Sequence, residues 1–265
     1  MTEPKTISVT ELEPEAAADV SGALAWARSC LAGNTQMRAW IDLDAIAEQP
    51  MLWTASLLLL HHLEANPTAG GWDGRRILEL GSGAGHLAVG MARLSAHVVA
   101  TESGECGTFE PMRASTQHLL AERAGGGEPS SGGSCAREGE SAALSAGSSS
   151  GTVAFRKLHW GLDDLPPAEW KGFDVILLSE LTFEPDLHEA LLGVLRHVLM
   201  PGMVAYSIFV DRPFSLNFMI MLDDDGSFDT EEIELANMLE LEDDLVVYAH
   251  VIRRKADVQD AKGAA

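Results

Sequence analysis

A short apolar run that ends at closely spaced glycines constrains this fold more than any other feature. The run is Arg76-Ile-Leu-Glu-Leu80, and Gly81-Ser-Gly-Ala-Gly85 follows it directly. The run predicts a buried strand, and a helix is predicted over 86–95, directly after the glycines. Small residues at such a turn let the backbone approach a ligand closely, and a helix N-terminus offers free N–H groups. We therefore expect a ligand at the carboxyl end of this strand, the alternative being a tight turn that binds nothing.

The rest of the chain alternates between predicted strands and helices. This alternation predicts one Rossmann-like α/β domain with a seven-stranded, mostly parallel sheet and helices on both faces. The last strand follows its neighbour without an obvious crossover helix, so we expect an antiparallel C-terminal edge. The predicted strands are 76–80, 97–102, 153–158, 173–179, 203–209 and 245–252, and the predicted helices are 52–64, 86–95, 109–123 and 186–199.

Composition divides the chain into four parts. Residues 1–50 form an N-terminal extension with a predicted helix around 16–31, and residues 51–255 form the α/β domain. Within the domain, 124–151 is rich in Gly and Ser and has almost no large aliphatic residue, which predicts a disordered insertion. Residues 256–265 form a C-terminal tail.

The charge balance limits the partners of this protein. Forty Asp and Glu against 18 Lys and Arg give a net charge of −22, which argues against nucleic acid and fits a basic protein partner. The segment 222–245 is acid-rich without Lys or Arg, and it is either a solvated face or a docking surface for such a partner. Three cysteines and scattered histidines predict neither a disulfide framework nor a metal site. With no secretory signal or membrane-spanning run expected, we predict a cytoplasmic or nuclear protein of undetermined oligomeric state.

The acids beside the glycine loop bear on the identity of the ligand. A dinucleotide fingerprint needs a third glycine where this chain has His86, so the loop is instead G-x-G-x-G. Glu79 precedes the loop by one residue, and a carboxylate there suits an ammonium group, which S-adenosylmethionine carries, rather than a pyrophosphate. Glu102 ends the next strand and suits two ribose hydroxyls, which NAD also has. Its alternative role is that of a solvated charge at a strand end.

Four separated motifs resemble class I S-adenosylmethionine-dependent methyltransferases, and more narrowly methyltransferase family sixteen, which contains protein-lysine methyltransferases. The similar segments are Leu52-Trp-Thr-Ala55, Ile77-Leu-Glu-Leu-Gly-Ser-Gly-Ala-Gly85, Leu158-His-Trp-Gly161 and Asp174-Val-Ile-Leu-Leu-Ser-Glu-Leu-Thr-Phe183. Arg212 and the segment 247–255 also resemble the end of the family's domain. The resemblance implies the class I methyltransferase sheet, S-adenosylmethionine as cofactor and a protein substrate.

The resemblance also implies roles for individual residues in the cofactor site. Trp53 would pack near the cofactor, Trp160 would lie against the adenine, and Ser179 would close the pocket. The glycine loop would line the methionine side and Glu102 would hold the ribose. Plain core packing is the alternative for both tryptophans. The predicted cofactor-binding set is Trp53, Glu79, Gly81, Ser82, Gly83, Gly85, Glu102, Trp160 and Ser179.

Glu180 and Phe183 are the predicted catalytic residues. We expect Glu180 to orient the acceptor amine and Phe183 to form the wall of its channel, the alternatives being helix capping and core packing. The family's Asp-x-x-Tyr is Glu180-Leu-Thr-Phe183 here, without the hydroxyl, and Thr182-Phe-Glu-Pro185 resembles a subgroup that methylates arginine. A small-molecule methyltransferase and a cofactor-binding module without turnover therefore remain open beside a lysine methyltransferase, and a NAD-dependent dehydrogenase is a distant further alternative.

Overall fold

The computed structural model describes residues 54–83, 85–103, 141–143, 151–161, 172–233 and 246–256. Several predicted features lie outside these ranges. They are the N-terminal extension, Trp53, the predicted helix 109–123, most of the Gly/Ser-rich insertion and nearly all of the C-terminal tail.

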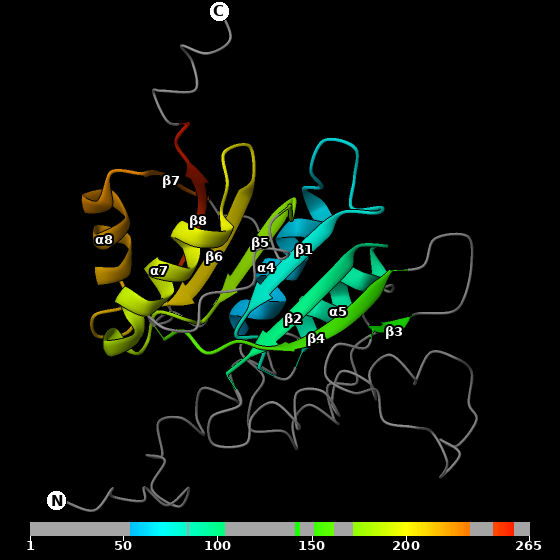
Figure 1. The fold of residues 1–265 in the computed structure, drawn as a ribbon, viewed down its shortest axis with the longest axis horizontal. Coiled ribbons are helices and arrows are strands. Elements are labelled where there is room, and N and C mark those ends of the chain that lie inside the picture. The colour runs from blue at the N-terminus through cyan, green and yellow to red at the C-terminus, as the bar shows by residue number, and fades with distance from the viewer. Residues whose placement is uncertain are drawn as a thin grey trace, which may run out of the picture.

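A twisted mixed sheet organises the described part of the chain, with strand order β3-β4-β2-β1-β5-β6-β8-β7 (Figure 1). The strands β4, β2, β1, β5 and β6 are parallel, whereas β8 is antiparallel to β6, which confirms the predicted Rossmann-like sheet and its antiparallel C-terminal edge. The predicted strands 76–80 and 97–102 agree residue for residue with the observed ones. The strands are β1 Arg76–Leu80, β2 His97–Glu102, β3 Ser141–Ala143, β4 Thr152–Lys157, β5 Val175–Ser179, β6 Val204–Val210, β7 Phe228–Glu232 and β8 Val247–Arg254.

The sheet has eight strands, one more than predicted. Strands β3 and β7 match none of the six predicted strand ranges. Strand β3 lies within the segment 124–151 that was predicted to be a disordered insertion, and it pairs antiparallel with β4. The prediction of disorder is therefore wrong for Ser141–Ala143. Backbone hydrogen bonds to an open sheet edge order these three residues without requiring large side chains.

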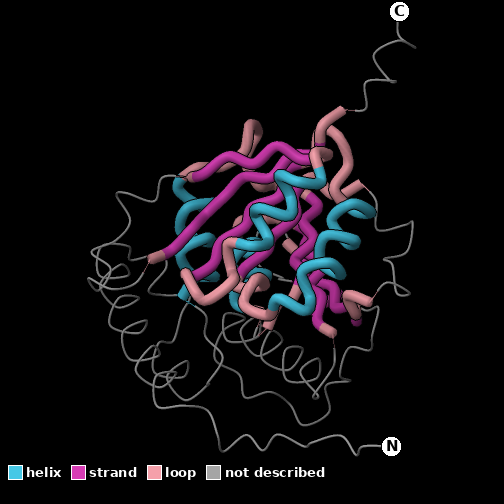
Figure 2. The backbone as a smooth tube through the Cα atoms, turned by 90° about the vertical axis from the view of Figure 1, so that its left-hand side faces the viewer, coloured by secondary structure: helices cyan, strands magenta, loops and turns pink. Residues whose placement is uncertain are grey.

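Helices cover both faces of the sheet (Figures 1 and 2). On one face lie α4 (Thr54–Ala65) and α5 (His86–Arg93), which pack over a core of buried aliphatic residues. Close packing between these helices depends on Gly90, because a Cβ at that position would lie 2.3 Å from Leu60. On the other face, the short 3-10 helix η4 (Pro185–Leu187) leads into α7 (His188–Val198), which is followed by α8 (Asn217–Asp225).

The acidic segment that begins at residue 222 forms the end of α8 and the edge strand β7. Asp223, Asp224 and Glu231 are exposed, and Glu231 forms an ion pair with Arg253 on β8 at 2.9 Å. Most acidic side chains of residues 222–233 are thus exposed, which agrees with a solvated face and with a docking surface alike, while 234–245 lies outside the described residues. The sequence did not predict β7, because its run Phe-Asp-Thr-Glu-Glu lacks the apolar residues that mark a strand.

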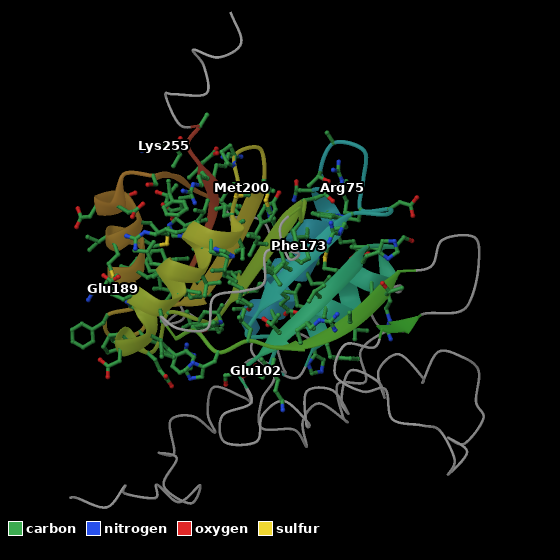
Figure 3. All side chains as sticks on the ribbon, in the orientation of Figure 1. Arg75, Glu102, Phe173, Glu189, Met200 and Lys255 are labelled. Carbon is green, nitrogen blue, oxygen red and sulfur yellow. The ribbon has the colours of Figure 1, made fainter. Side chains whose placement is uncertain are left out.

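The strand order reverses direction at β1, whose two neighbours are β2 and β5. In open parallel sheets, ligands bind outside the carboxyl ends of the strands at such a point. The glycine loop follows β1, Glu102 ends β2, and Glu180 follows β5. The candidate site therefore lies at this edge, where Figure 3 labels Glu102.

Candidate cofactor site and the loops beside it

The glycine loop is held in a left-handed backbone conformation. Gly81, Gly83 and Gly85 have φ values of 58°, 52° and 81°, a region that other residues adopt only with strain. Within the loop, the Ser82 N–H donates to the Thr101 carbonyl oxygen at 2.7 Å, and Ser82 Oγ accepts a hydrogen bond from the Thr101 N–H at 3.1 Å. Ser82 thus ties the loop to β2. The sequence did not single out Thr101, because no motif marks it.

Gly81 lies where three loops meet. A Cβ at this position would be 2.6 Å from Leu181 Cδ2 and 3.4 Å from Trp160 Cζ2. Leu181 follows β5 and Trp160 follows β4, so the ends of β1, β4 and β5 converge here. Trp160 is half-buried against the core, which leaves part of the indole accessible beside the glycine loop. The structure therefore brings together two residues predicted to bind the cofactor.

Glu102 takes part in the organisation of the loop. Its Oε2 accepts a hydrogen bond from the Gly83 N–H at 3.1 Å, and its Oε1 accepts one from the Ser103 N–H at 3.1 Å. The side chain is half-buried, unlike a fully solvated charge at a strand end. Glu102 therefore lies beside the glycine loop, as predicted for a ribose-binding carboxylate.

Glu79 is buried beneath the glycine loop, with 2% of its surface exposed. Its Oε2 has no hydrogen-bond partner among the described residues. Burial raises the pKa of Glu79 to about 8, with a smaller contribution from the nearby Glu102, against the opposing hydrogen bonds from Ser82 and the Ala88 backbone. An unpartnered buried carboxylate oxygen is costly, and a ligand cation would offset this cost.

The protein's stability is therefore expected to depend on the titration of Glu79. Its pKa is about 8 in the folded protein and 4.5 in the reference state, so between these pH values the folded state binds more protons than the unfolded state. Stability should fall as pH rises through this window, by up to about 1.4 kcal/mol per pH unit. Urea unfolding of the cofactor-free protein from pH 5 to pH 8 measures this slope. The Glu79→Gln variant is the control, and an equal pH slope in both proteins would contradict the expectation.

Ser179 lies at the end of β5, where its Oγ is 2.9 Å from Ser56 Oγ of α4. This contact brings the first turn of α4 to the edge of the sheet that carries the glycine loop. Trp53 immediately precedes α4 in the chain but lies outside the described residues. Its predicted place near the cofactor therefore stays a prediction.

Glu180 is buried and is held by groups of the chain itself, so its predicted role in orienting the acceptor stays a prediction. The residue has φ 56° and is 3% exposed. Its Oε1 accepts a hydrogen bond from the Val210 N–H at 3.1 Å, and its Oε2 forms an ion pair with Arg212. The carboxylate thus faces the end of β6 and a cation of the chain itself, instead of capping a helix. Both contacts join positions about thirty residues apart, which no local motif reveals.

Phe183 lies in the loop between β5 and η4 and is 41% exposed. This exposure rules out the alternative that Phe183 is a core residue. The loop is anchored from below, because buried His188 donates through Nε2 to the Thr182 carbonyl oxygen at 2.9 Å. Phe183 is therefore presented to solvent from an anchored loop that also carries Leu181.

Two further observations concern alternative classes of site. No helix within the described ranges is long and apolar enough to cross a membrane. Among the same residues, no cluster of His, Cys, Asp or Glu side chains is arranged to hold a metal ion.

Comparison with curated proteins gives a relative of known name. The chain is 30% identical to the protein N-terminal and lysine N-methyltransferase EFM7 of Eremothecium gossypii over 175 residues. The match covers 63% of this chain and 57% of that relative, so it spans little more than half of the relative's length. The predicted resemblance to protein methyltransferases is confirmed. No family model matches the chain.

The solved structures that this chain matches include an rRNA methyltransferase and a protein in complex with SAH. One of them is the 16S rRNA N2 G1207 methyltransferase RsmC of T. thermophilus in complex with AdoMet and guanosine. It is 21% identical to this chain, and the match covers 78% of this chain and 45% of that one with a TM-score of 0.48. The DhpI–SAH complex is 15% identical and covers 89% and 96%, with a TM-score of 0.47. Because both TM-scores lie below 0.5, these likenesses do not by themselves establish a function.

Proposed function

We propose that this protein is an S-adenosylmethionine-dependent methyltransferase that methylates a side chain of a protein, with lysine as the acceptor. The observation that carries this proposal is the buried Oε2 of Glu79 beneath the glycine loop, which has no hydrogen-bond partner in the part of the chain that the structure describes. S-adenosylmethionine has an ammonium group that suits this carboxylate. A pyrophosphate would be repelled by the same group once it ionises.

The residues at the ends of β1, β2 and β4 fit the parts of this cofactor. Glu79 would attract the ammonium group, and the glycine loop would allow close approach of the methionine portion. Glu102 has the acceptor oxygens that two ribose hydroxyls need, and the accessible part of the Trp160 indole suits a flat purine. Each of these groups borders the place where Leu181 and Trp160 approach Gly81.

The bound cofactor supplies a methyl group on a positively charged sulfur. Glu79, the glycine loop, Glu102 and Trp160 would hold this cofactor, and its methyl group would pass from sulfur to the lone pair of a neutral acceptor nitrogen. The acceptor would release one proton to water before this transfer. Alignment of the two reactants is the main task of the protein in such a transfer. A lysine acceptor must first become neutral, although its free pKa is about 10.4, and an apolar wall such as the exposed ring of Phe183 lowers that pKa by desolvation.

The acceptor class is supported by the relative and by the charge of the chain. The name of the relative specifies protein N-termini and lysine as its acceptors. A net charge of −22 favours the approach of a basic protein, as it would for any cationic acceptor. Arginine is the alternative acceptor, and it differs from lysine because its guanidinium stays charged at every accessible pH. Analysis of the methylated amino acid in the product distinguishes the two acceptors.

Transfer of label from S-adenosylmethionine with a tritiated methyl group to a cell lysate tests this function. We expect label in a protein band that protease removes and nuclease does not, with methyl-lysine as the hydrolysis product. The Glu102→Ala variant should bind the cofactor about 1.5–3 kcal/mol more weakly, because hydrogen bonds to a charged group are lost. Glu232→Ala, which removes an exposed carboxylate at the end of β7, is the matched control. Binding of NAD alone, or label only in small molecules, would contradict the proposal.

A further inference from the structure

Exposed apolar side chains gather at one edge of the sheet. Of the six large apolar residues that are exposed in the described ranges, four lie at or next to the carboxyl ends of β5 and β6. A fifth, Ile220, lies in the first half of α8, the helix that begins seven residues after β6. Val246 belongs to this group because its carbonyl oxygen accepts a hydrogen bond from the Asp211 N–H at 2.8 Å. We call these five residues the acceptor-side patch: Phe183 41%, Phe214 65%, Leu216 37%, Ile220 56% and Val246 50% exposed.

The sixth exposed apolar residue is Met200, which lies at the opposite edge of the sheet. It precedes β6, whereas the patch follows β5 and β6 in the chain. Figure 3 labels Met200 on the upper side of the sheet and Glu102 on the lower side. The exposure of apolar side chains is thus concentrated on the side of the molecule that carries the cofactor site. Exposed apolar side chains gathered on one side of a molecule are typical of interaction sites.

Two residues of the patch, Phe214 and Leu216, line a hollow of about 430 Å³ together with Asp211, Arg212, Pro213 and Asn217. Phe214 stands beside it with φ 72°, a backbone conformation in which an aromatic residue is strained. A strained, two-thirds-exposed aromatic ring contributes little to folding, because the ring stays in water. A partner that covers the Phe214 ring would account for an exposed aromatic side chain at this position.

The charges around the patch are acidic. Glu184, Asp186 and Glu189 are exposed in and after the loop that carries Phe183, and exposed Asp211 lines the hollow. We call these four residues the acidic rim. The cation of this region, Arg212, forms an ion pair with Glu180. The surface therefore combines apolar side chains with negative charge.

The patch is continuous with the wall of the cofactor site. Phe183 lies two residues after Leu181, which approaches Gly81, and Arg212 in the hollow is paired with Glu180 of the same loop. A polypeptide that covers the patch would thus lie beside the place where the methyl group is transferred.

We propose that the acceptor-side patch docks a segment of the protein acceptor that carries apolar side chains beside lysine or arginine. This inference rests on the proposed function. Apolar side chains of the segment would cover Phe214 and Leu216, while the aliphatic stem of a basic residue lies on the patch and its charge faces the acidic rim. A nucleic acid is disfavoured because the rim repels phosphate, and a second copy of this chain would bring a second net charge of −22.

Binding of a short, capped, fluorescein-labelled peptide of leucine and lysine tests the apolar part of this inference. Phe214→Ser is expected to raise the Kd by about tenfold or more, as for a central aromatic contact in an interface. Met200→Ser removes a similarly exposed apolar side chain from the opposite edge and should leave the Kd unchanged. Affinity for S-adenosylmethionine and the thermal unfolding midpoint should be unchanged in both variants. With a protein acceptor, Phe214→Ser should raise KM and leave kcat nearly unaltered.

The acidic rim is tested by charge removal. The double variant Asp211→Asn, Glu184→Gln should weaken peptide binding at low salt and flatten its salt dependence, since surface charges act through a screened field. Asp73→Asn, which removes an exposed carboxylate before β1 at the opposite edge, is the control. A peptide with glutamate in place of lysine should bind more weakly to the wild-type protein.

Several results would overturn the inference. The first is an equal affinity of Phe214→Ser and Met200→Ser for the peptide, and the second is an equal affinity of the wild-type protein for the glutamate and lysine peptides. The third is a wild-type dimer that Phe214→Ser dissociates in sedimentation. The fourth is binding of RNA that Phe214→Ser abolishes. The proposed function fails separately. If the wild-type protein transfers no methyl group but binds the lysine peptide through Phe214, the methyltransferase proposal is wrong and the docking surface stands.

Discussion

Replacing Gly81 by valine is expected to abolish binding of S-adenosylmethionine while the sheet remains folded. The new Cβ would lie 2.6 Å from Leu181 and 3.4 Å from Trp160, at the meeting point of the three loops. A branched side chain must therefore displace these two residues or occupy the cofactor's place. Overpacking of this kind costs about 1–3 kcal/mol, and the left-handed backbone at φ 58° adds about 1–2 kcal/mol. We expect affinity to fall by more than about a hundredfold in calorimetry.

Gly74→Val is the matched control for this variant. Gly74 also has a left-handed backbone, with φ 69°, but a Cβ there would meet nothing within 4 Å. It precedes β1, at the opposite edge of the sheet, so it incurs the same kind of backbone strain without obstructing the candidate site. Similar cofactor affinity of the two variants would show that the site has been placed wrongly.

Replacing Arg212 by methionine is expected to lower the free energy of unfolding by about 3 kcal/mol or more. The carboxylate of Glu180 has a side-chain exposure of 2%, and Arg212 provides its cation. Removal of one partner from a buried pair leaves an uncompensated charge, which costs about 3–5 kcal/mol. Urea unfolding at pH 7 measures this loss. The double variant Glu180→Gln, Arg212→Met should recover most of the stability, because it removes the stranded charge as well.

Arg253→Met is the control for the ion pair. Arg253 and Glu231 are 51% and 69% exposed, and a surface pair of this kind contributes about 0–1 kcal/mol. If Arg212→Met costs no more than Arg253→Met, the Glu180–Arg212 pair does not hold the loop after β5. Glu180 would then be available to orient an acceptor directly, as the sequence predicted.

The strands of this protein are largely predictable from local sequence. Arg76–Leu80 and His97–Glu102 were located residue for residue, because an apolar run that stops at a glycine turn or at an acid has sharp ends. The same local signal placed the glycine loop at the carboxyl edge and identified Glu79 and Glu102 as its neighbours. Glu79 adjoins the loop in the chain, whereas Glu102 reaches it because β2 pairs in parallel with β1 and both strands end at the same edge.

The edges of the sheet were not predictable in this way. The short strand β3 lies in a Gly/Ser-rich segment, and β7 is mostly acidic. Both belong to the sheet because a neighbouring strand offers unpaired backbone groups. Backbone pairing depends little on the side chains that a sequence pattern reads.

The sequence by itself determined the central parallel strands of the sheet, the glycine loop and the acids that border it, because local hydrophobic runs and turn residues specify them. The tertiary structure alone decided what those acids face. It left one oxygen of Glu79 without a partner among the residues that the structure describes, and it paired Glu180 with Arg212 across 32 positions. It also gathered Phe183 and Phe214 at one edge of the sheet. The reason is physical: burial and ion pairing depend on which strands become neighbours, and here the neighbours are distant in the chain.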